Sequence, residues 1–147
     1  MPVTRIPVAM KKIIIIQIIA CLLILLFVYA GMSKLLDHRV FSLQLTQSPL
    51  IGRWAAVIAW VLPAGELLLV VSLVLPATRL LGLYLSLALL LLFTIYLLYM
   101  LGFSVHLPCS CGGVIRYMSW KQHVGFNCVF ILLAAMGIRL HRGIKNS

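Results

Sequence analysis

The sequence predicts an all-α membrane protein, a bundle of four transmembrane helices, from its composition and from the spacing of its charges. Of its 147 residues, 64% are hydrophobic and only 10% are charged, whereas a soluble domain carries about 25% charged residues. Four long apolar runs divide the chain. Backbone N–H and C=O groups cannot remain unpaired in lipid, so each run is expected to form a helix.

The four helices are predicted where apolar runs approach the length of about 20 residues that crosses a bilayer's hydrocarbon core. Residues 13–33, 80–105 and 122–138 contain no charged side chain, and Glu66 is the only charged residue in the 25 residues before Arg79. No linker, repeat or second domain interrupts this pattern. We therefore expect a single membrane domain, residues 1–147, with helices at about 13–32, 54–75, 79–103 and 121–138.

The first apolar run resembles a signal peptide because Lys11 and Lys12 precede it. It is longer than the apolar region of a typical signal peptide, and no clean cleavage site with small residues follows it. We expect it to be retained as a transmembrane helix.

The basic residues predict the orientation of the helices, because short cytoplasmic loops are enriched in Lys and Arg. Seven lie on the side of the termini: Arg5, Lys11, Lys12, Arg79, Arg139, Arg142 and Lys145. Five lie on the other side: Lys34, Arg39, Arg53, Arg116 and Lys121. This bias predicts a multi-pass protein of the bacterial inner membrane with both termini in the cytoplasm. The loops 33–53 and 104–120 then face outward.

The net charge of +10 does not indicate nucleic-acid binding. The basic residues lie at helix ends, where they favour lipid headgroups, and no basic stripe is interleaved with exposed aromatic residues. The expected environment is the lipid bilayer.

The segment "HLPCSCGG" places Cys109 and Cys111 one residue apart in the second outer loop. A bent C-x-C segment can reach the Cα separation that a disulfide needs, and strained or exposed disulfides are the ones that exchange readily. Arg116 is close in sequence, and a nearby positive charge favours the thiolate. The functional interpretation is a redox-active dithiol on the outer side of the membrane.

Two other interpretations of this segment remain open. His106, Cys109, Cys111 and His123 are residue types that bind zinc or copper, so a metal site is the second interpretation. An inert structural disulfide is the third, although closing so short a loop removes little chain entropy.

Cys21 and Cys128 both fall inside predicted helices, at similar depths in the bilayer. They could meet if the first and fourth helices face each other. A cysteine in such a position more often behaves as a small hydrophobic residue.

Glu66 is the only acidic side chain inside a predicted span. Ionisable groups in the membrane are costly and often mark functional sites. The structural alternative is a hydrogen bond to Gln17, Asn127 or a tyrosine of another helix. Tyr96 and Tyr99 are expected to belong to an aromatic belt at the membrane interface rather than to contact a quinone.

Three segments together resemble a known family: "YAGMSKLLD" at the end of the first helix, "LPAGELLL" in the second, and "CSCGG" before the fourth. In order and spacing they are similar to the MauE branch of the DoxX-like membrane proteins, over about residues 13–138. The resemblance implies a four-helix inner-membrane protein that supports disulfide formation in an exported protein. Cys109 and Cys111 would be the dithiol and Glu66 the buried acid. The aromatic residue usual after the family's C-x-C-x is replaced here by Gly112 and Gly113.

The leading hypothesis is therefore a redox accessory protein, a component of thiol–disulfide oxidoreduction. Its expected partner is a periplasmic thioredoxin-like protein or an exported client that contains cysteines. No cofactor is assigned, but comparison with quinone-linked disulfide generators, which use two cysteine pairs, suggests a membrane quinone as acceptor. The alternatives are a metal-binding or transport module and a structural subunit of a membrane complex.

Overall fold

The computed structural model describes residues 6–48, 50–103 and 119–146. In chain order its elements are α1 (Val8–Leu36), α2 (His38–Thr46), the 3₁₀ turn η1 (Gly52–Trp54), α3 (Ala55–Val74), α4 (Arg79–Phe103) and α5 (Trp120–Lys145). Every element in these ranges is helical, which confirms the predicted all-α fold class.

Four of the helices, α1, α3, α4 and α5, are long and apolar enough to cross a membrane. Large apolar side chains cover their outer surfaces, among them Leu25, Leu68, Leu92 and Leu132. Apolar surface of this extent is stable against lipid but not against water. The fold is therefore that of a multi-pass membrane protein with four spans.

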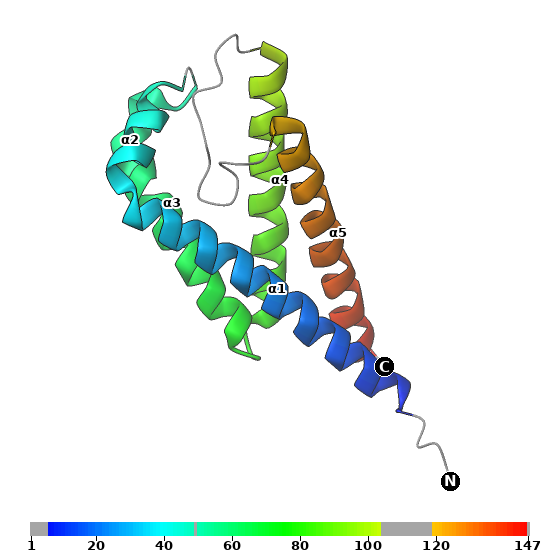
Figure 1. Ribbon diagram of the computed structural model, residues 1–147. Coiled ribbons are helices and arrows are strands. Elements are labelled where there is room, and N and C mark those ends of the chain that lie inside the picture. The colour runs from blue at the N-terminus through cyan, green and yellow to red at the C-terminus, as the bar shows by residue number, and fades with distance from the viewer. Residues whose placement is uncertain (1–5, 49, 104–118, 147) are drawn as a thin grey trace.

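The spans form two pairs, α1 with α3 and α4 with α5. The pairs meet at the end of the bundle that contains the turn between α3 and α4, and they diverge toward the end that carries α2 (Figure 1). The first turns of α1 and the last turns of α5 lie together at the meeting end, where Gly143 lies close to the Lys12 side chain. The bundle thus has a closed half and an open half.

The closed half is densely packed around one apolar cluster, which includes Ile19, Leu23, Leu73, Leu83 and Ala134. Two glycines on α4 and α5 bring the helices into close contact here. A Cβ atom on Gly82 would lie 3.0 Å from the backbone nitrogen of Leu73, and one on Gly137 would lie 3.3 Å from the side chains of Ile19 and Leu83. Small residues of this kind are typical where membrane helices approach closely.

Two helices extend beyond their predicted ends. The prediction ended the first helix near residue 32 because Lys34 follows, but α1 continues to Leu36 and the Lys34 side chain is buried. The last helix was predicted to end near residue 138, but α5 continues to Lys145. Arg142 and Lys145 lie in its last turn, where positive charge favours the helix dipole.

The segment 33–53, predicted to be a loop, contains an unpredicted helix, α2. Phe41 and Leu45, one helical turn apart, are buried against Ala55 and Ala59 of α3. At the start of α2, the centroid of the His38 ring lies 4.0 Å from the centroid of the Trp60 ring. A helix of nine residues is too short to be recognised as a long apolar run, and its position depends on this packing.

Candidate functional site

A buried ion pair joins α1 to α3 in the open half. The ammonium group of Lys34 donates to the Glu66 carboxylate, with Nζ 2.8 Å from Oε1 and 3.2 Å from Oε2. The side chains are 4% and 0% exposed. Both charges are therefore shielded from solvent and from lipid by the surrounding helices.

The residues around Lys34 account for its position. Gly31 lies one turn earlier on α1, and a Cβ atom there would come within 3.4 Å of the Leu67 side chain, so the two helices are close at this level. The third ammonium proton points to the carbonyl of Ala30, 3.3 Å from Nζ. An ammonium group has three N–H donors, so Glu66 and Ala30 account for all of them.

Aromatic rings complete the surroundings of the Lys34 ammonium. Nζ lies 5.9 Å from the centroid of the Phe41 ring and 5.8 Å from that of Phe93. At such distances the face of a ring attracts a cation. Residues of α1, α2, α3 and α4 therefore converge on one charge.

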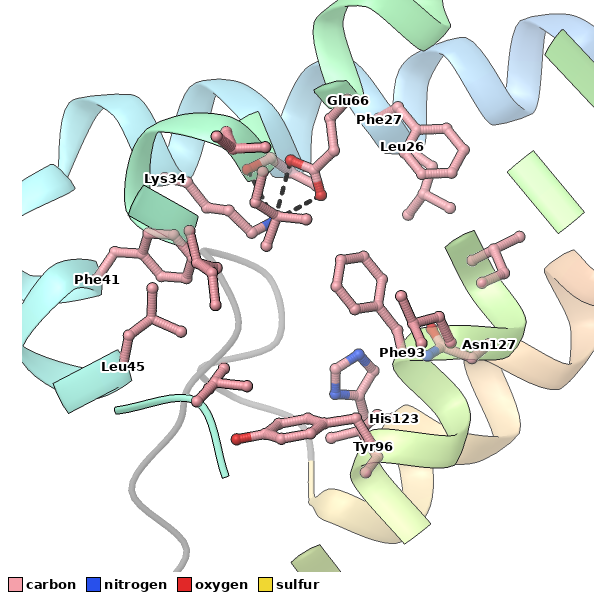
Figure 2. Close-up of a pocket in the computed structure, with 18 of the residues that line it drawn as sticks. Leu26, Phe27, Lys34, Phe41, Leu45, Glu66, Phe93, Tyr96, His123 and Asn127 are labelled. Atoms are coloured by element: carbon pink, nitrogen blue, oxygen red, sulfur yellow. Dashed lines mark hydrogen bonds and ion pairs between the residues drawn. The ribbon is translucent and has the colours of Figure 1, made fainter. Parts of the chain in front are cut away.

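A cavity of about 380 Å³ lies beside the ion pair, between the diverging helix pairs (Figure 2). Its polar side chains are Lys34, Glu66, Tyr96, His123 and Asn127. The remaining lining is apolar: Leu26, Phe27, Ala30, Phe41, Leu45, Ile51, Ile58, Val61, Leu62, Leu90, Leu92, Phe93, Leu97 and Phe126. Ligand sites in proteins share this character, an apolar concavity with a few placed polar groups.

His123 and Asn127 supply the polar groups on the α5 wall. They are four residues apart, so they lie on the same face of the helix, and they are 6% and 5% exposed. Figure 2 shows them across the cavity from Lys34 and Glu66. No hydrogen bond joins either side chain to another residue in the described part of the chain. Tyr96, in contrast, is held by Ser48, with its hydroxyl 2.6 Å from Ser48 Oγ.

The structure identifies a partner for Glu66 that the sequence prediction missed. Gln17, Asn127 and the tyrosines were named as candidates, but the carboxylate binds Lys34. Gln17 lies on the exposed face of α1. Lys34 had been counted as an outer-loop charge. The sequence did contain a hint of this pair. Lys34 is a basic residue directly after the first apolar run, and Glu66 is the only acidic residue within a predicted span.

The two tyrosines differ in their environment. Tyr99 is 39% exposed, whereas Tyr96 lines the cavity. The aromatic belt stays a prediction for both residues.

The predicted dithiol residues Cys109 and Cys111 lie outside the described residues, as do Arg116 and His106. Of the proposed metal ligands only His123 is described, and it faces the cavity. The described ranges contain no group of three or more His, Cys, Asp or Glu side chains that could hold a metal ion.

Cys21 and Cys128 do not form a pair. Both are free thiols on exposed surfaces of α1 and α5. Although the two helices contact each other, these side chains lie outside the interface. The expectation that they behave as small apolar residues fits this position better than a redox role.

Comparison with models of known protein families found a match to one family. Residues 12–140 match the family described as methylamine utilisation protein MauE. No curated protein and no solved structure gave a significant match. The matched range contains α3, α4, most of α1 and α5, the Lys34–Glu66 pair and the C-x-C segment. The chain belongs to the MauE family.

Proposed function

We propose that this protein is a membrane accessory factor that exchanges disulfides with exported proteins through Cys109 and Cys111. The observation that carries the proposal is a pair of cysteines one residue apart inside the range that matches the MauE family. The partner is a thioredoxin-like protein or a client with cysteines of its own.

The exchange follows the ordinary chemistry of thiols and disulfides. A client thiolate attacks the Cys109–Cys111 disulfide and forms a mixed disulfide, and a second client thiolate then displaces the cysteine of the accessory protein. The client is oxidised by two electrons, and the C-x-C pair becomes a dithiol. Arg116 favours the thiolate form of that dithiol. Reoxidation requires an acceptor of two electrons and two protons, either a membrane quinone or a disulfide of the partner.

The second cysteine pair of a relay must come from elsewhere. Cys21 and Cys128 are free and lie on exposed faces of their helices, so they do not supply a disulfide inside the bundle. The proposed exchange therefore depends on Cys109 and Cys111 alone within this chain.

The proposed location is the bacterial inner membrane, with both termini in the cytoplasm and the C-x-C segment outside. Lys34 is engaged by Glu66 and is not available to lipid headgroups. Without Lys34 the outer side has four basic residues against seven on the side of the termini. The positive-inside bias is thereby stronger than the simple count.

The ion pair is proposed to support this function by holding the open half together. It joins the end of α1 to the middle of α3, and both helices also pack against α2. This assigns Lys34 and Glu66 a structural part in the exchange, with no direct step in the thiol chemistry.

The test is thiol labelling in intact cells with a membrane-impermeant maleimide. The variant Cys21→Ser/Cys128→Ser removes the two other cysteines, so that all labelling reports on Cys109 and Cys111. We expect labelling only after reduction. The matched control is Cys109→Ser/Cys111→Ser, which retains the two helix cysteines and should not acquire the reduction-dependent signal.

A second measurement addresses the exchange itself. In cells that carry Cys109→Ser/Cys111→Ser, the exported clients should accumulate in the reduced form, as observed by trapping their thiols with a maleimide that adds mass. If every client disulfide forms normally, the proposal is wrong.

A further inference from the structure

We infer that the cavity between the two helix pairs binds the head group of a membrane quinone, through His123 and Asn127. This deepens the proposed function, on which it rests for the role of a quinone as electron acceptor, and it assigns that acceptor a site built only from helix residues, with neither cysteine of the exchange pair. The inference rests on the access, lining and unused hydrogen-bonding groups of the cavity.

Access is from the bilayer. Val61 and Leu92 line the cavity, yet each is also 62% exposed on the outer surface of the spans. The cavity therefore reaches the lipid-facing surface of the bundle. Its volume of about 380 Å³ lies within the range of about 300–1,000 Å³ that is usual for small-molecule sites. A lipid-soluble ligand can enter its ring and leave an apolar tail in the bilayer.

The lining favours a flat and neutral ring. Phe27, Phe41, Phe93 and Phe126 contribute aromatic rings to the wall, and such rings pack well against a planar ligand. Among the described lining residues, the one cation and the one anion bind each other, and the ammonium protons of Lys34 are already directed to acceptors. A phosphate or a fatty-acid carboxylate would have to compete with Glu66.

The α5 wall supplies donors for the ligand. His123 and Asn127 are more than nine-tenths buried, face the cavity and have no hydrogen-bond partner among the described residues. Polar groups left unpaired in a low-dielectric interior are unfavourable. A quinone carbonyl accepts hydrogen bonds from an imidazole N–H or an amide N–H. An acyl chain of a phospholipid would fill the space but leave both groups unpaired.

The experiment measures equilibrium binding to the purified, delipidated full chain in detergent micelles. The probes are ubiquinone-1, which has a benzoquinone ring and one isoprenyl unit, and an alkylbenzene with a ring and tail of the same size but no oxygen. We use the Cys109→Ser/Cys111→Ser background as well as the wild type. Loss of disulfide exchange then cannot be mistaken for loss of quinone binding.

The variants separate the donors from the fold. Asn127→Leu and His123→Phe should each weaken ubiquinone-1 binding by about fivefold to tenfold, the effect of one hydrogen bond, and leave alkylbenzene binding unchanged. Ala30→Phe, which fills the cavity from α1, should abolish the binding of both probes. Gln17→Leu is the matched control, because it removes a side-chain amide from the exposed face of α1 and should change neither.

A wild-type protein that prefers ubiquinone-1 over the alkylbenzene, with this preference lost in Asn127→Leu, supports the inference. Equal binding of both probes would identify the cavity as an acyl-chain site and overturn it, as would the absence of ubiquinone-1 binding. Photolabelling of the wild type with an azidoquinone decides the case if the variants do not fold. Adducts on the cavity faces of α4 and α5 support the site, and adducts elsewhere refute it.

Discussion

The two halves of the bundle are built from the same four spans but differ in how those spans are held together. In the closed half, glycines allow backbone-level contact between helices, and the interior is a continuous apolar cluster. In the open half the helix pairs diverge around a cavity, and an ion pair joins α1 to α3. The closed half is held by close helix packing, whereas the open half combines the apolar contacts of α2 with α3 and a buried ion pair.

The difference has a physical reason. Apolar packing between membrane helices gains energy only at close contact, because lipid tails are as apolar as leucine. Next to the cavity the helix pairs diverge (Figure 1), but α1 and α3 remain close to each other at Gly31. The Lys34–Glu66 ion pair adds a directional interaction between these two helices.

The largest expected effect comes from removing one partner of the ion pair. Lys34→Met leaves the Glu66 carboxylate buried without a counter-charge. We expect the free energy of unfolding to fall by about 3–5 kcal/mol, the usual cost of breaking such a buried pair. SDS titration of the protein in mixed micelles, followed by circular dichroism, measures this change.

Two controls sharpen that prediction. The double variant Lys34→Met/Glu66→Met removes both charges and should recover most of the loss, because a well-packed apolar pair is often as stable as a buried ion pair. Lys121→Met removes an exposed cation of α5 and should have little effect. If the double variant is as unstable as Lys34→Met, the charges are not the cause of the instability.

The next effect concerns the closed half. Gly82→Ala would place a Cβ atom 3.0 Å from the backbone nitrogen of Leu73, where the neighbouring atom cannot move easily. We expect a loss of about 1–3 kcal/mol from overpacking, measured by the same titration. Gly65→Ala is the matched control, since a Cβ atom there meets nothing within 4 Å.

The control has a defined expectation of its own. Alanine in a helix interior is favoured over glycine by about 0.5–1 kcal/mol, so Gly65→Ala should be neutral or slightly stabilising. Equal losses in Gly82→Ala and Gly65→Ala would show that close packing does not distinguish the closed half.

The smallest effect is expected at the start of α5, where a capping box begins the helix. The Gln122 backbone N–H donates to Ser119 Oγ at 3.2 Å, and the Ser119 N–H donates to Gln122 Oε1 at 3.0 Å. Ser119→Ala should cost about 1 kcal/mol. Ser119→Asp retains an acceptor for the Gln122 backbone N–H and should restore most of the stability. The most sensitive measurement is amide hydrogen exchange in the first turn of α5. A variant Ser119→Asp that frays as much as Ser119→Ala would argue against a capping role.

The sequence by itself determined the four spans, because hydropathy and charge spacing are properties of consecutive residues. The third span, α4 (Arg79–Phe103), begins at the residue where the prediction placed its start. Glu66 was recognised as unusual for the same reason, as a lone charge inside an apolar run. Family membership was also recognisable, because it depends on the order of short motifs along the chain.

The tertiary structure alone decided what those residues contact. From the sequence alone, Lys34 is expected to be a charged residue of a loop. Only when α1 and α3 lie side by side is it buried against Glu66, which is 32 positions away in the chain. Whether His123 and Tyr96 face a cavity or the lipid depends on how far the helix pairs diverge. That divergence results from the summed packing of the whole bundle, which no local pattern encodes.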